Sequence, residues 1–214
     1  GLVRTLHSGG HEIACHGYKH EFVFGIGRES FREDISSAKK RLEDLTGEAC
    51  LGYRAPGFSL REQELWALEI VREEGFIYDS SIFPGVRANG GIDGFFKYPQ
   101  VLKLDAGELA ELPISTSKVL GVTSAFCGGG FFRFFPAWYI HKHIKLINDE
   151  EQPGVVYIHP RDIDPGQPRL KLKWFNRFIY YFGLKHAEEK FRTLVAAFEW
   201  ENFGAYAKRM LDGR

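Results

Sequence analysis

The stretch CLGYRAPGFS, residues 50–59, decides the predicted fold, because it contains a short apolar strand that ends in an arginine. Residues 50–54 have the composition of a strand, and Pro56 and Gly57 stiffen the turn that follows. Amphipathic helices are predicted on both sides of this strand. Short apolar strands that alternate with helices are typical of an α/β fold with a parallel sheet, which can close into a barrel.

The two flanking helices have sequence signals for their starts and stops. Capping boxes at 30–33 and 59–62 predict where they begin, and Gly47 and Gly75 predict where they end. Apolar residues recur at helical spacing in both segments: Phe31, Ile35, Ala38, Leu42 and Leu45 in the first, and Leu65, Leu68 and Val71 in the second.

The same alternation continues through most of the chain. Further strands are predicted at 11–14, 76–79, 111–114 and 155–159, and further helices at 2–6, from near Pro136, and at 187–198. The glycine-containing segment 83–110 is expected to be a surface excursion or a small hairpin. We therefore expect a single domain over residues 1–214, incomplete at its N-terminus, with about 165–214 as a C-terminal extension.

The composition limits the possible partners. Lys plus Arg and Asp plus Glu each total 28, and no sustained basic run is present, so nucleic acid is not expected as a partner. No apolar run is long enough for a membrane span. Three widely spaced cysteines fit a reducing, cytoplasmic compartment. The composition leaves open whether copies form a homo-oligomer.

Two histidines follow the strand at 11–14 and could bind one metal ion. His16 and His20 are four residues apart, and imidazole is a good ligand for Zn²⁺ or another divalent metal. A pair at this spacing is also common without any metal. A catalytic zinc site has three protein ligands, and neither Asp34 nor Asp79 is an obvious third one from its spacing.

Two more strands end in residues that could do chemistry. Arg54 ends one strand, and His159 ends the apolar strand VVYIH at 155–159, where a general acid could lie. Each could equally be a structural residue. Strand ends on one face of an α/β barrel converge on one cleft, so His16, His20, Arg54 and His159 are stronger candidates together than separately.

The order of four motifs resembles the polysaccharide deacetylases with NodB homology, carbohydrate esterase family 4, and most closely their exosortase- and exopolysaccharide-associated branch. The motifs are GHEIACHGYKH at 10–20, YRAPGF at 53–58, YDSSIFP at 78–84 and YIHP at 157–160. GGGFFR at 128–133 and DPGQPR at 164–169 also resemble that branch. The resemblance implies a distorted (β/α) barrel that lacks its first strand here.

The resemblance implies a site and a reaction. His16 and His20 match the metal ligands, Arg54 the arginine that orients the catalytic base, and His159 the general acid. Asp79 falls near the aspartate that tunes this acid. The implied enzyme is a hydrolase of non-peptide carbon–nitrogen bonds that removes N-acetyl groups from an amino-sugar polysaccharide or oligosaccharide, and we expect Pro56, Phe58, Gly129 and Phe131 to bind that glycan.

The sequence departs from this family in two places. The Asp-rich motif that supplies the base and the third metal ligand is absent upstream of His16, so we expect the 214-residue chain alone to be nearly inactive. After His159 the branch usually has Pro-Trp-Glu, whereas this chain has PRD at 160–162.

Two other functions fit the same residues. Some relatives of this fold hydrolyse small amides or ureides, in some cases without a metal. A degenerate relative could only bind glycan, through aromatic side chains at Tyr98, Phe131, Phe132 and Trp138.

Overall fold

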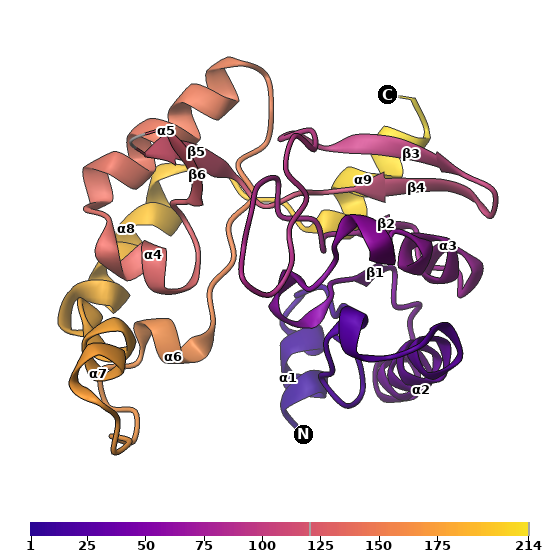
Figure 1. Cartoon of the computed structure of the whole chain (residues 1–214), viewed down its shortest axis with the longest axis horizontal. Coiled ribbons are helices and arrows are strands. Elements are labelled where there is room, and N and C mark those ends of the chain that lie inside the picture. The colour runs from indigo at the N-terminus through magenta and orange to yellow at the C-terminus, as the bar shows by residue number, and fades with distance from the viewer. Residues whose placement is uncertain (120, 214) are drawn as a thin grey trace. The chain divides into compact units, whose positions relative to one another are not determined.

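The structure is a computed structural model that describes residues 1–119 and 121–213 (Figure 1). The chain divides into two compact units, one formed by Gly1–Pro113 with Glu201–Arg214 and the other by Ile114–Trp200. The single domain expected over 1–214 stays a prediction.

The first unit contains a four-stranded sheet with the order β1-β2-β4-β3. β1 pairs in parallel with β2 and β2 with β4, while β3 and β4 form an antiparallel hairpin. Its strands are β1 (Gly52–Tyr53), β2 (Tyr78–Asp79), β3 (Gln100–Leu104) and β4 (Gly107–Glu111). Its helices are α1 (Leu2–Ser8), α2 (Arg28–Thr46), α3 (Trp66–Glu73) and α9 (Phe203–Leu211), with 3-10 turns η1 (Val23–Gly25), η2 (Pro56–Phe58) and η3 (Glu62–Glu64).

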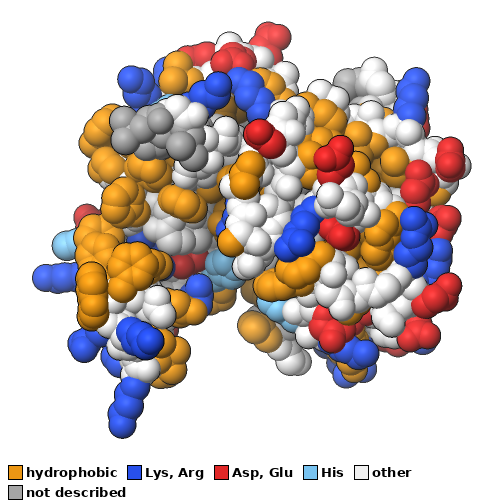
Figure 2. All heavy atoms as spheres, viewed as in Figure 1, with side chains coloured by type: hydrophobic (Ala, Val, Ile, Leu, Met, Phe, Trp, Pro, Cys, Tyr) orange, Lys and Arg blue, Asp and Glu red, His pale blue; other side chains and the backbone are white. Residues whose placement is uncertain are grey.

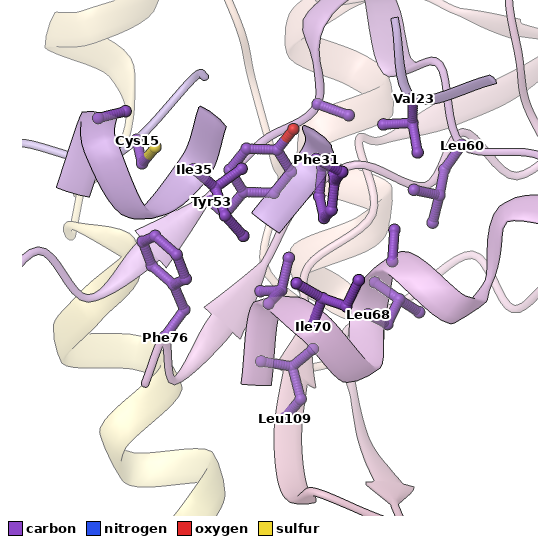
Figure 3. Close-up of a cluster of buried hydrophobic side chains, with 14 of the residues drawn as sticks. Cys15, Val23, Phe31, Ile35, Tyr53, Leu60, Leu68, Ile70, Phe76 and Leu109 are labelled. Carbon is purple, nitrogen blue, oxygen red and sulfur yellow. The ribbon is translucent and has the colours of Figure 1, made fainter. Parts of the chain in front are cut away.

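Successive residues of β4 point to opposite faces of the sheet, and each face has its own apolar cluster. Leu109 belongs to the larger cluster, in which the apolar sides of α2 and α3 pack together, and Phe31 of α2 meets the Tyr53 ring edge to face at 5.6 Å (Figure 3). Ala110 faces α9 on the other side. The periodic residues that predicted α2 and α3, apart from Leu45, thus supply or pack against this core.

The predicted start of each flanking helix is wrong, although the helices themselves are confirmed. α2 begins at Arg28, so Ser30 lies inside the helix, and no side chain caps it. Ser59 does not cap α3 either, because its hydroxyl accepts the backbone N–H of Val23 at 3.1 Å. A tertiary hydrogen bond replaces the local one in this case.

The second unit has a two-stranded hairpin and several helices. The elements are β5 (Thr116–Val119), β6 (Val122–Ala125), α4 (Gly129–Phe134), α5 (Ala137–Asp149), α6 (Pro160–Ile163), α7 (Trp174–Tyr181), η4 (Leu184–His186) and α8 (Ala187–Ala197). The expected strand at 155–159 is reduced to one bridge between Tyr157 and Gly128. Residues 11–14, expected as a strand, form none, and the bridge between Cys15 and Tyr53 follows them. Within 1–119 and 121–213, no helix combines the length and apolarity needed to cross a membrane.

Candidate functional site

His16 and His20 lie together in the loop that follows Cys15. Their ring centroids are 5.0 Å apart and the rings are nearly perpendicular, at 76°. Nδ1 of His16 is 2.6 Å from the backbone oxygen of Arg54. This carbonyl can only accept a hydrogen bond, so Nδ1 of the neutral His16 ring carries the proton and Nε2 is the unprotonated nitrogen.

Asp34 of α2 holds this loop in place. Its two carboxylate oxygens accept the backbone N–H groups of Tyr18 at 2.8 Å and Lys19 at 2.9 Å. A Cβ on Gly17 would lie 2.8 Å from Oδ2 of Asp34, so the loop passes close to the carboxylate only because residue 17 is a glycine. His20 has a left-handed backbone with φ 60°, a conformation that costs energy and often occurs at functional sites.

The histidine pair fits a metal ion as two of its ligands, since neutral imidazole nitrogens suit Zn²⁺. In the part of the chain that the structure describes, no three His, Cys, Asp or Glu side chains are arranged to hold a metal ion. Asp34 uses both oxygens on the loop backbone. The pair therefore lacks the third protein ligand of a catalytic zinc site within this part of the chain.

Arg54 is fixed at both its backbone and its side chain. Its N–H donates to the Cys15 oxygen at 3.0 Å, which places it beside the histidine loop. The guanidinium donates from Nε to the Ser80 carbonyl at 3.0 Å and from an Nη to the Ser80 hydroxyl at 2.7 Å. The Phe58 and Phe203 rings lie 5.5 and 5.4 Å from the guanidinium carbon.

Asp79 forms a fully buried carboxyl pair with Glu111. Asp79 accepts the backbone N–H of Ser81 at 2.8 Å and its hydroxyl at 2.7 Å, and Glu111 accepts the backbone N–H of Ile82 at 3.2 Å. Burial and the Asp79 charge raise the pKa of Glu111 well above its ordinary value. Among the described residues no donor reaches Oε2 of Glu111, and its burial beside the Asp79 charge favours the protonated form of the Glu111 carboxyl.

His159 lies in the second unit at the N-terminus of α6. Its Nδ1 is 2.9 Å from Oδ2 of Asp162, which also accepts the His159 backbone N–H at 3.1 Å. Oδ1 of Asp162 is 3.3 Å from Nε of Arg133, and both of these side chains are buried. The His159 side chain is 54% exposed, so its ring is held by Asp162 while much of it faces solvent.

The predicted glycan-binding residues differ in exposure. Pro56, Phe58 and Gly129 are buried, whereas Phe131 is 39% exposed. Phe132, one of the aromatic residues of the glycan-binding alternative, has no exposed surface and cannot contact a glycan. Gly129, in the motif GGGFFR at 128–133, begins α4.

The structure therefore places His16 in contact with both His20 and Arg54, and the Arg54 side chain binds Ser80, which follows Asp79 in the sequence. His159, Gly129 and Phe131 belong to the other unit. The sequence did not point to the roles of Asp34, Glu111 and Asp162. Of these three residues, only Asp162 could have been found from a local sequence pattern. An acidic side chain three residues after the N-cap of a helix often accepts the backbone N–H of the N-cap residue.

Comparisons with known proteins give a consistent result. Residues 80–208 match the family described as Domain of unknown function (DUF3473), and residues 1–72 match the family Polysaccharide deacetylase. Over 80 residues, 37% of this chain, the sequence is 29% identical to a peptidoglycan deacetylase of Helicobacter pylori and 30% identical to the peptidoglycan deacetylase-like protein FGM2 of Gibberella zeae. These alignments cover 26% and 23% of the relatives, so they span about a quarter of each.

Three solved structures share the fold. A Mycobacterium smegmatis structure assigned to the polysaccharide deacetylases has a TM-score of 0.63 at 23% identity, covering 99% of this chain and 66% of that one. Puue allantoinase gives 0.60 at 18% identity over 99% and 62%, and a probable polysaccharide deacetylase of Pseudomonas aeruginosa PAO1 gives 0.58 at 18% over 100% and 63%. The predicted α/β fold of the polysaccharide deacetylase type is confirmed.

Proposed function

Because the chain belongs to the DUF3473 family and its first 72 residues match the polysaccharide deacetylases, we propose that it is part of a metal-dependent polysaccharide N-deacetylase. The substrate would be an N-acetylated amino-sugar polymer. The reaction would be hydrolysis of a non-peptide carbon–nitrogen bond, with release of acetate. The relatives from Helicobacter pylori and Gibberella zeae, named for peptidoglycan deacetylation, support this substrate class.

The single observation that carries the proposal is the environment of His16. A histidine that ligates a metal almost always donates its other ring N–H to a carbonyl or carboxylate, and His16 Nδ1 meets the Arg54 carbonyl at 2.6 Å. His20 is held beside it by a loop that Asp34 restrains. A histidine pair without a ligand would not need this degree of positioning.

Six of the predicted site residues have a role in this proposal, and the buried Pro56, Phe58 and Gly129 are not assigned one. His16 and His20 would hold the metal ion, which when bound lowers the pKa of a water molecule and polarises the acetyl carbonyl. Arg54 would orient the carboxylate base. His159, with Asp162 on its Nδ1, would give the proton to the departing amine nitrogen from Nε2 as the carbon–nitrogen bond breaks. Asp79 would influence the proton affinity of this acid, and Phe131 would contact sugar rings.

The test compares the 214-residue chain with the product of the complete coding sequence. Bound metal is measured in both proteins, and acetate release is measured with an oligomer of N-acetylglucosamine. The variants His16→Ala and His20→Ala remove the proposed ligands. His11→Ala is the matched control, because His11 is an exposed histidine of the same segment.

We expect the product of the complete coding sequence to bind one metal ion, release acetate, and lose both properties in His16→Ala and His20→Ala but not in His11→Ala. The 214-residue chain should show little activity, because the Asp-rich motif that supplies the catalytic base is absent upstream of His16. General base catalysis alone contributes about 100-fold or more. Acetate release that survives chelation and both substitutions would contradict the proposal. Cleavage of a small amide in place of the glycan would favour the metal-independent hydrolase.

A further inference from the structure

Helix α7 and the residues around it expose an unusual amount of aromatic and aliphatic surface. None of the eight residues of α7 is buried, and Trp174 is 81% exposed, Phe175 57% and Phe178 52%. Leu170, Ile179 and Phe182 add to the same surface. We call residues 169–185 the aromatic–basic segment. An exposed apolar patch on this scale commonly marks an interaction site.

The charge of this segment is strongly one-sided. Five cations lie between Asp164 and Glu188, and no acidic residue lies among them: Arg169, Lys171, Lys173, Arg177 and Lys185. The chain as a whole is neutral, with 28 basic and 28 acidic residues. The local excess therefore points to a partner with negative charge. In Figure 2 orange and blue side chains lie together over the region that Figure 1 labels α7.

The aromatic–basic segment is attached to the folded second unit. One Nη of Arg133 donates to the carbonyl oxygens of Tyr180 at 2.8 Å and Phe182 at 3.0 Å. The backbone N–H of Leu170 donates to the Tyr181 hydroxyl at 2.8 Å, so the turn before α7 folds back onto the helix. The Phe182 ring contacts Phe134 of α4, with centroids 5.8 Å apart. The exposed side chains are thus presented by an ordered element.

We propose that the aromatic–basic segment binds the surface of a membrane that contains anionic lipids, with α7 lying in the interface. Trp, Tyr and Phe prefer the depth of the lipid headgroups, and Lys and Arg beside them attract anionic headgroups. An eight-residue helix is much too short to span a bilayer, so the attachment is peripheral. Such attachment would hold the second unit at a membrane surface.

A neutral glycan explains these residues less well. Aromatic rings alone could stack on sugars, but a neutral N-acetylated glycan gives no reason for five cations without an acid. Leu170 and Ile179 are aliphatic and exposed, and they offer no ring face for stacking. Aliphatic and aromatic side chains that alternate with cations match the headgroup region of a bilayer.

The experiment is co-sedimentation of the chain with vesicles of phosphatidylcholine alone or mixed with about one third phosphatidylglycerol. One double variant, Trp174→Ser with Phe178→Ser, removes exposed apolar surface. A second, Lys171→Glu with Lys173→Glu, reverses two charges. The matched controls are Trp138→Ser, an exposed tryptophan of α5, and Lys118→Glu, an exposed lysine of β5. Circular dichroism checks that every variant is folded.

We expect binding to the anionic vesicles that weakens as salt rises, and a loss of about tenfold or more in either double variant. The two controls should bind like the unchanged chain. Three outcomes would overturn the proposal: no vesicle binding, equal binding to neutral and anionic vesicles, or unchanged binding in both double variants. Loss of self-association in the aromatic double variant, without any loss of vesicle binding, would assign the surface to a second copy of the chain instead.

Discussion

Nδ1 of His159 lies 2.9 Å from Oδ2 of Asp162, and the other oxygen of the same carboxylate lies 3.3 Å from Nε of Arg133. Burial by itself raises the pKa of Asp162, but the hydrogen bonds from His159 and the Arg133 charge outweigh it and lower this pKa overall. Asp162 is therefore a charged acceptor, which favours the proton of His159 on Nδ1 and leaves Nε2 for chemistry. Asp162 and Arg161 are the two residues at which PRD at 160–162 departs from the Pro-Trp-Glu pattern.

The first prediction concerns Asp162→Asn, which would leave the buried Arg133 without its charge partner. We expect the free energy of unfolding to fall by about 3 kcal/mol at pH 7, measured by urea denaturation. Because the folded pKa of Asp162 is lowered, its contribution is present above pH 3.8 and is lost as pH falls through the folded pKa. The control Asp149→Asn removes an exposed pair with Lys145 and should cost less than about 0.5 kcal/mol. Equal losses in the two variants would contradict this account.

The second prediction concerns Asp34→Asn, which weakens the two hydrogen bonds that restrain the histidine loop. We expect a loss of about 1–3 kcal/mol in stability. In the product of the complete coding sequence, we also expect metal affinity to fall by about 10- to 100-fold, because loop residues that orient the ligands become mobile. The neighbouring exposed Glu33→Gln serves as control. Calorimetric titration with Zn²⁺ measures the affinity, and an unchanged value in Asp34→Asn would refute the positioning role.

The third prediction separates steric collision from backbone strain at Gly17. Gly17 and Gly47 both have φ 77°, but a Cβ on Gly17 meets Asp34 at 2.8 Å, whereas a Cβ on Gly47 meets nothing within 4 Å. Ala at either position costs about 1 kcal/mol or more for the left-handed conformation. We expect Gly17→Ala to lose more stability than Gly47→Ala in thermal denaturation. Similar losses would show that the loop moves away from Asp34 without cost.

The fourth prediction follows from the buried Asp79–Glu111 pair. Burial and Asp79 raise the pKa of Glu111 above its ordinary 4.5, so the folded state holds a proton that the unfolded state releases. Unfolding free energy should thus fall as pH rises from about 4.5 through the folded pKa, by at most about 1.4 kcal/mol per pH unit. Glu111→Gln should flatten this slope, and the exposed Glu108→Gln on the same strand should not. Urea denaturation at several pH values measures both slopes.

Helices α2 and α3 of the first unit were predictable because their information is local, whereas α9 (Phe203–Leu211) was not predicted. Phe31, Ile35 and Ala38 recur at helical spacing, and all three are buried in α2. The left-handed Gly47 ends this helix, as its position in the sequence predicted. The capping boxes failed for a different reason. Ser59 can hydrogen-bond to any nearby backbone N–H, and the folded chain brings it to Val23.

The sequence by itself determined the α/β class, helices α2, α3, α5 and α8, and the histidine and arginine candidates, because each depends on periodicity or on motifs within a few residues. Only the tertiary structure decided which groups restrain them. Asp34 reaches the backbone of Tyr18 and Lys19 from a helix 15 or more residues away, and Glu111 meets Asp79 across paired strands β2 and β4. Such contacts depend on how the sheet register and helix packing bring distant segments together, so no local sequence pattern predicts them.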